Sequence, residues 1–184
     1  KDLTVENGKV RLQVVLGFPA KGYIAELQQT LENIIKSLNG VAQAEVSVDW
    51  KLAAHKVQKG VEPLKNVKNI IAIASGKGGV GKSTVSANLA LALLAEGAGV
   101  GILDADIYGP SQPRMLGVSG QPESTDGKSL EPKISHGLQS MSIGYLIDEE
   151  TPMIWRGPMV TQALEQLLKD TNWRAIDYLI VDLP

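Results

Sequence analysis

Residues 76–84 read Gly-Lys-Gly-Gly-Val-Gly-Lys-Ser-Thr, and this stretch decides how the rest of the chain is interpreted. It fits the pattern G-x-x-x-x-G-K-[ST] of a phosphate-binding P-loop. Glycines let the backbone wrap closely around a phosphate, successive backbone N–H groups form an anion-binding nest, and a following helix adds its positive end. The residues predicted to bind ATP are Gly76, Lys77, Gly78, Gly79, Val80, Gly81, Lys82, Ser83 and Thr84.

The sequence on either side of this loop is consistent with that prediction. Residues 70–74 are wholly apolar and rich in β-branched side chains, which is typical of a parallel strand covered on both faces. An amphipathic helix that ends at Gly97 follows the loop, and residues 100–103 predict a second strand. In this setting Lys82 is expected to bridge the β- and γ-phosphates, and the Ser83 hydroxyl to bind Mg²⁺.

Three aspartates are predicted to lie near the loop. Asp104 and Asp106 follow the second strand, and Asp182 closes the apolar run 178–183. The carboxyl ends of parallel strands are where open α/β sheets place their sites. Asp182 is expected to hold Mg²⁺ through water, as a Walker-B aspartate does. For Asp104 and Asp106 the pattern leaves a second interpretation open, in which each caps a helix or turn.

The chain is predicted to contain two domains of α/β structure. Residues 1–50 read as strand, helix and strand, part of a small α/β domain, and residues 51–68 as a polar linker. Residues 69–184 read as the N-terminal part of a P-loop ATPase domain, a mostly parallel sheet flanked by helices. Within it, 109–133 is rich in Gly, Pro and Ser and predicts a long loop.

Composition excludes several other classes of protein. The 184 residues are 43% hydrophobic and carry a formal net charge of −2, so we expect a globular protein that binds no nucleic acid. No apolar run is long enough to span a bilayer, and no cysteine is present, which predicts a cytoplasmic protein without a membrane partner. The chain begins without methionine and stops inside an apparent buried strand, so we expect a fragment of a longer protein.

The second residue of the motif, Lys77, carries a family resemblance. Lys-Gly-Gly-Val-Gly-Lys-Ser-Thr is the deviant Walker-A form, and it resembles the MinD/ParA/nitrogenase-iron-protein class of dimerising ATPases. In that class the extra lysine reaches the phosphates of the nucleotide in the partner subunit. The resemblance therefore implies a homodimer in which Lys77 acts across the interface.

Other stretches narrow the resemblance to the Mrp/ApbC family of iron–sulfur cluster carrier ATPases. They are Ile-Leu-Asp-Ala-Asp-Ile-Tyr-Gly-Pro-Ser at 102–111, Met-Ile-Trp-Arg-Gly-Pro at 153–158, and Tyr-Leu-Ile-Val-Asp-Leu-Pro at 178–184. Residues 1–50 resemble part of the small domain that precedes the ATPase in many members.

This family resemblance implies roles for individual residues and for partners. Asp106 would belong to switch I and position the attacking water, beside Lys77 and Lys82 as catalytic residues, and Asp104 would support the Mg²⁺ shell. The partners would be an iron–sulfur scaffold or recipient apo-proteins. The family's Cys-x-x-Cys lies downstream of Pro184, so no iron–sulfur ligand is expected within these residues.

Two alternatives remain open at this point. One is a positioning or partition ATPase of the MinD/ParA kind, a switch that carries no cluster. The other is a stably packed fragment that binds partners but no nucleotide.

Overall fold

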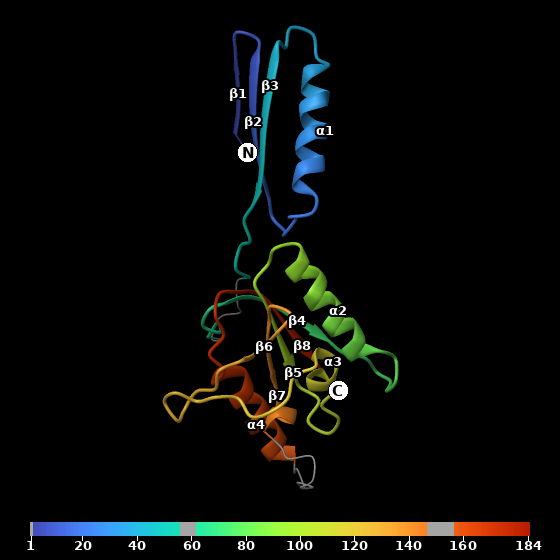
Figure 1. The fold of residues 1–184 in the computed structure, drawn as a ribbon, viewed down its shortest axis with the longest axis vertical. Helices are drawn as coiled ribbons and strands as arrows, with labels where there is room; N and C mark the ends of the chain where they lie inside the picture. The colour runs from blue at the N-terminus through green and yellow to red at the C-terminus, as the bar shows by residue number, and fades with distance from the viewer. Residues whose placement is uncertain (1, 56–61, 147–156) are drawn as a thin grey trace. The chain divides into compact units, whose positions relative to one another are not determined.

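The computed structural model describes residues 2–55, 62–146 and 157–184, and the chain divides into two compact units. The first unit comprises Lys1–Ala53 with Ala95–Gly97, and the second comprises Ala54–Leu94 and Ala98–Pro184. Figure 1 labels the elements.

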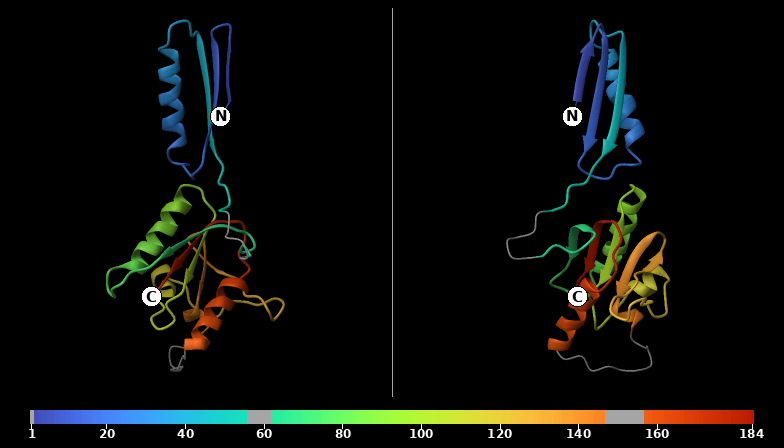
Figure 2. Two further views of the ribbon diagram at one scale, coloured as in Figure 1. Left: turned by 180° about the vertical axis from the view of Figure 1, so that it is seen from behind. Right: turned by 90° about the vertical axis from the view of Figure 1, so that its left-hand side faces the viewer.

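The first unit is built on a three-stranded sheet of order β1-β2-β3, with one helix between its second and third strands. β1 and β2 form an antiparallel hairpin, and β2 and β3 pair in parallel from Lys9↔Gln43 to Leu16↔Trp50. Figure 2 shows α1 lying beside β3, with β1 at the far edge of the sheet. Its elements are β1 (Asp2–Glu6), β2 (Lys9–Leu16), α1 (Ile24–Lys36) and β3 (Gln43–Trp50).

The second unit contains a five-stranded sheet of order β4-β8-β5-β7-β6. All neighbouring strands are parallel except β6 and β7, so the predicted mostly parallel sheet is confirmed. Its elements are β4 (Val67–Ile73), α2 (Lys82–Ala95), β5 (Val100–Asp104), α3 (Gln112–Leu116), β6 (Lys133–Ser135), β7 (Leu138–Ser142), the 3₁₀ helix η1 (Ile143–Tyr145), α4 (Gly157–Lys169) and β8 (Ile176–Asp182).

Helices cover both faces of this sheet, as the apolar character of its strands predicts. Successive residues of β5 and β8 point to opposite sides: Leu103 and Leu179 pack in one core cluster, and Ile102 and Ile180 in the other. The first cluster includes Leu167 and other residues of α4, and the second includes α2 (Figure 1). The central strands are therefore closed to water on both sides.

The structure differs from the sequence prediction in three places. β1 is present, although no strand was predicted before residue 10, and β4 begins at Val67, inside the stretch predicted as linker. α3 interrupts the predicted loop 109–133 and ends at Gly117, whose φ of 65° gives a left-handed cap. The backbone N–H groups of Ser111 and Gln112 at the start of α3 donate to Asp104, at the end of the preceding strand, and composition alone did not reveal this helix of five residues.

Asp177 ties three strands together at the amino end of the sheet. Its Oδ1 accepts a hydrogen bond from Lys68 Nζ at 2.7 Å, its Oδ2 accepts from Gly99 N at 2.8 Å, and its carbonyl accepts from Asn69 Nδ2 at 3.1 Å. Asp177 is 8% exposed, so these contacts fix the starts of β4, β5 and β8 against one another.

Candidate nucleotide-binding site

The glycine-rich segment lies where β4 ends and α2 begins, the position of a phosphate-binding loop in a strand–loop–helix unit. Gly79 and Gly81 have φ of 72° and 86°, a region that residues with a Cβ rarely adopt. Space is open around Gly76, Gly78, Gly79 and Gly81, since a Cβ there would meet nothing within 4 Å. This conformation leaves room for a ligand to approach the backbone closely.

Side chains of the loop differ in exposure. Lys77 and Val80 are exposed, whereas Lys82 and Ser83, in the first turn of α2, are half-buried. Val85 N donates to Gly81 O at 2.9 Å and closes that first turn. The exposed position of Lys77 leaves it accessible to a ligand or to another chain.

Asp104 and Asp182 end two adjacent parallel strands and are register partners. Both are fully buried at 0% exposure. Asp182 Oδ1 accepts a hydrogen bond from Ser86 Oγ at 2.9 Å, and its Oδ2 accepts from Gln112 Nε2 at 2.8 Å. The link from α2 to Asp182 therefore comes from Ser86, one turn beyond Ser83.

Asp104 accepts hydrogen bonds from the loop that leads into α3, from the first residue of α3 and from the end of β7. Its Oδ2 accepts from Ser111 N at 2.9 Å, Gln112 N at 3.0 Å and Ser142 Oγ at 3.2 Å, and its Oδ1 accepts from Asp106 N at 3.2 Å. Burial raises the pKa of Asp104 from 3.8 to about 6, although these hydrogen bonds lower it and the Asp182 charge raises it further. Asp104 thus caps the start of α3, and its four hydrogen bonds use about as many lone-pair sites as a carboxylate offers.

Asp106 lies at the start of the same loop and is half-buried. Its Oδ1 accepts a hydrogen bond from Gly109 N at 3.0 Å, which closes a turn over residues 106–109. The capping interpretation therefore describes contacts that both Asp104 and Asp106 make. For Asp106 it does not conflict with a role at a ligand, because one accepted hydrogen bond leaves most of the lone-pair sites of its carboxylate unused.

Gln112 is a site residue that sequence reasoning missed. It is 1% exposed, and its Nε2 donates to Asp182 Oδ2 at 2.8 Å and to Ser83 O at 3.1 Å. It lies in the stretch predicted as a loop, and no signal in the sequence distinguishes it from other polar loop residues. Only its position after the Asp104–Asp106 pair could have drawn attention to it.

The structure therefore gathers the P-loop, Asp104, Asp106 and Asp182 at the carboxyl edge of one sheet. The donor set fits a magnesium nucleotide, because Mg²⁺ prefers oxygen ligands and retains several waters. Residues 153–156 of the Met153–Pro158 stretch lie outside the described residues. Among the residues that the structure describes, no group of three or more acidic or histidine side chains is arranged for a metal ion.

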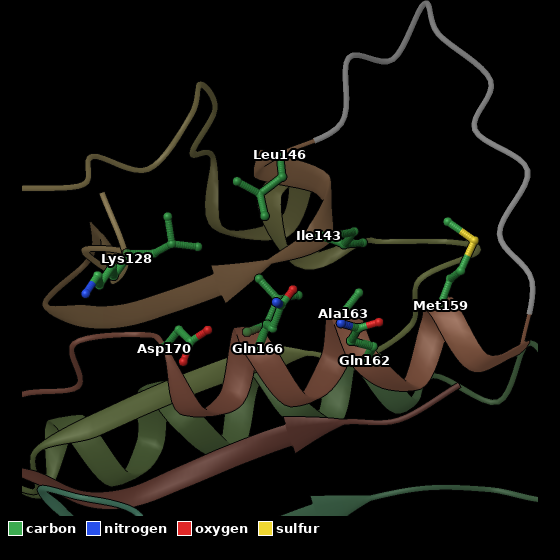
Figure 3. Close-up of a pocket in the computed structure, with 10 residues that line it drawn as sticks. Lys128, Ile143, Leu146, Met159, Gln162, Ala163, Gln166 and Asp170 are labelled. Atoms are coloured by element: carbon green, nitrogen blue, oxygen red, sulfur yellow. The ribbon is translucent and has the colours of Figure 1, made fainter. Parts of the chain in front are cut away.

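A separate pocket of about 520 Å³ lies between α4 and the segment around η1 (Figure 3). Met159, Gln162 and Gln166 of α4 form one wall, and Ile143 and Leu146 face them. None of the predicted nucleotide-binding residues lines this pocket. Its walls are mainly apolar, so it does not resemble a phosphate site.

Two family matches cover nearly all of the chain. Residues 66–184 match the family described as NUBPL iron-transfer P-loop NTPase, and residues 1–48 match one described as iron–sulfur cluster assembly protein. The chain belongs to the NUBPL iron-transfer P-loop NTPase family. The resemblance inferred from the motifs is thereby confirmed.

Individual relatives agree with membership of this P-loop NTPase family. Proteins named iron–sulfur cluster carrier protein from Synechocystis sp. and Escherichia coli are 46% and 47% identical over 100% and 95% of this chain. The matched regions make up 53% and 48% of the length of those two proteins, respectively. The mouse iron–sulfur cluster transfer protein NUBPL is 47% identical over 67% of this chain and 39% of its own length. The chain thus spans about half the length of the curated relatives it matches.

A solved structure supports the fold of the NTPase part. A nucleotide-binding protein from Archaeoglobus fulgidus, in complex with ADP, superposes with a TM-score of 0.55 at 38% identity. The match covers 65% of this chain and 45% of that protein. In the described parts of the chain, no helix is both long and apolar enough to cross a membrane.

Proposed function

We propose that this chain is the nucleotide-binding part of a dimeric, slowly hydrolysing ATPase that carries iron–sulfur clusters to apo-proteins. One observation carries the proposal: in a member of an iron-transfer NTPase family, the P-loop and two buried strand-end carboxylates meet at one sheet edge. The names of its relatives and the ADP bound by its structural neighbour support the same assignment.

Each residue of the site then has a role toward Mg·ATP. The P-loop N–H groups and Lys82 bind the phosphates; the Ser83 hydroxyl holds Mg²⁺, and Asp104 and Asp182 hold it through its waters. The cation, when bound, neutralises charge that develops on the phosphates. Asp106 orients the attacking water, and Lys77, exposed on the loop, reaches the nucleotide of a second subunit.

The iron–sulfur cluster is the cargo of this cycle. The sequence contains no cysteine, so thiolate ligands for a cluster have to come from outside these 184 residues. Hydrolysis then resets the conformation of the dimer, and the cluster chemistry takes place elsewhere. Neither the described residues nor the relatives offer an observation that favours a positioning ATPase.

Reconstitution of the full-length protein tests the proposal. Iron and sulfide are added anaerobically, the visible absorption is recorded, and transfer to an apo-ferredoxin-type acceptor is followed with and without Mg·ATP. We expect a chromophore and nucleotide-dependent transfer. Lys82→Ala should weaken ATP binding about 10- to 100-fold, because it removes a charged contact to phosphate, without abolishing the chromophore.

Lys65→Ala, which replaces an exposed lysine outside the site, is the matched control and should leave both properties unchanged. Intact ATP binding without any chromophore would contradict the carrier function and leave a nucleotide switch. Unchanged ATP affinity in Lys82→Ala would contradict the site assignment itself.

A further inference from the structure

The side-chain amide of Gln112 has an orientation fixed by its neighbours. The group within hydrogen-bonding distance of both Asp182 Oδ2 and Ser83 O has to be the NH₂, because a carboxylate and a carbonyl can only accept. Both N–H bonds are thereby used. Gln112 is 1% exposed, so its amide is shielded from bulk solvent.

The other end of the same amide lacks a donor. Gln112 Oε1 is buried and accepts no hydrogen bond from the described residues. The neighbouring Ser111 Oγ is in the same state, and within the described ranges these are the two side-chain atoms for which this holds. Buried acceptors in proteins are nearly always satisfied, if necessary by a bound water. The two atoms therefore mark a place where a further donor belongs.

The backbone of Gln112 connects the same residue to the other buried carboxylate. Its N–H donates to Asp104 Oδ2 at 3.0 Å. One residue at the start of α3 thus contacts the end of β5, the end of β8 and the first turn of α2. A ligand that altered any of these contacts would act on α3 directly.

We propose that Gln112 is a positioning residue of the Mg·nucleotide site: its NH₂ holds Asp182 and Ser83 in place, and its Oε1 accepts a hydrogen bond from a water bound to Mg²⁺. This inference rests on the proposed binding of Mg·ATP. Both atoms belong to one planar amide, so Oε1 lies within a few ångström of the two predicted metal-site residues. A water on a divalent cation is a strong hydrogen-bond donor and supplies what Oε1 lacks.

The test measures nucleotide affinity in the full-length protein with Mg²⁺ and with EDTA, using a fluorescent ADP analogue. The wild type should bind more tightly with Mg²⁺. Gln112→Met keeps length and volume but removes both polar ends, and should reduce the Mg²⁺-dependent gain about tenfold, the effect of one hydrogen bond to a charged group. Its affinity in EDTA should change by less than about twofold, since Oε1 then has no cation-bound donor to lose.

Gln139→Met is the matched control. The Gln139 side chain also makes two hydrogen bonds, donating to Arg174 O at 2.7 Å and accepting from Arg174 N at 2.9 Å, but at the start of β7 and away from the P-loop. It should lower the Tm without changing the Mg²⁺-dependent gain. Hydrogen exchange of residues 111–117 provides a second readout: Mg·ADP should slow it in the wild type and in Gln139→Met, but not in Gln112→Met.

If Gln112→Met does not fold, Gln112→Glu tests whether Gln112 contributes to the Mg²⁺-dependent gain in nucleotide affinity. It keeps an acceptor but places a second carboxylate beside Asp182, so the protein should be less stable without Mg²⁺ and gain more from Mg²⁺ than the wild type. A Mg²⁺-dependent gain equal to that of the wild type in either Gln112 variant would show that the residue is only structural. A wild type that binds nucleotide without regard to Mg²⁺ would instead contradict the proposed function, and the inference with it.

Discussion

The two sheets of this chain differ in how far water reaches them. All five residues of β5 are buried, whereas all five residues of β1 are exposed and β2 alternates between exposed and covered positions. The carboxylates follow the same division. Asp104 and Asp182 are enclosed by protein donors, while Asp2, Glu6, Glu45 and Asp49 of the first sheet face solvent. The strand-end aspartates therefore depend on protein hydrogen-bond donors, whereas the carboxylates of the first sheet are open to water.

The largest expected effect comes from shortening a side chain in the covered sheet. Ile180→Ala removes atoms from a residue with 0% exposure and should lower the free energy of unfolding by about 3–4 kcal/mol, through lost transfer energy and a cavity. Leu3→Ala, at 61% exposure, should cost less than about 1 kcal/mol. Urea unfolding with hydrogen exchange in each sheet measures both. Equal losses of unfolding free energy in the two variants would contradict the difference in burial between the two sheets.

The second effect is a pH dependence that belongs to the covered sheet. The pKa of Asp104 is raised from 3.8 to about 6, so between these values the folded protein keeps a proton that the unfolded chain has released. Stability should therefore fall as pH rises from about 4 to 6, by up to about 3 kcal/mol. Urea titrations of the nucleotide-free protein should show this slope, and Asp104→Asn should lack it. Parallel curves for the two proteins would contradict the raised pKa.

A smaller effect is expected from one buried hydroxyl. Ser86 Oγ donates to Asp182 and is 0% exposed, so Ser86→Ala should cost about 1–2 kcal/mol by leaving that carboxylate with fewer donors. Ser37→Ala removes a comparable bond, from Ser37 Oγ to Ile34 O at 2.7 Å, at an exposed position of the first unit. Thermal unfolding should show a clear shift for the first variant and almost none for the second. A larger thermal shift for Ser37→Ala than for Ser86→Ala would contradict the expectation that the buried hydrogen bond stabilises the protein more.

The smallest effect is expected at the surface of the first sheet. Arg11 Nε and Glu45 Oε2 lie 3.0 Å apart, but their side chains are 73% and 67% exposed. Glu45→Gln should therefore change the free energy of unfolding by less than about 0.5 kcal/mol, because water and salt screen the pair. Denaturation of both proteins in low and in high salt measures this small contribution of the ion pair to the free energy of unfolding. A loss above about 1 kcal/mol would show that the first sheet is less open than its exposure suggests.

Features that depend on neighbouring residues in the sequence could be predicted, and features that depend on contacts between distant segments could not. The P-loop was predictable because Gly79 and Gly81 report a backbone requirement of their own positions. Asp104 and Asp182 could be expected at one edge, since strand ends of a parallel sheet gather there. β1 was missed because its alternation is short: Leu3 and Val5 are the two apolar residues in a strand of five. Gln112 could not be identified, because its three contacts join segments that only the tertiary fold brings together.

The hydrogen bonds of Asp177 have a mechanical consequence. They bind β4, β5 and β8 to one another at the amino end, opposite the strand ends that carry Asp104 and Asp182. Because these bonds join the strands at the amino end, we expect a bound ligand to shift the opposite strand ends, and α3 beside them, more than the end that Asp177 holds.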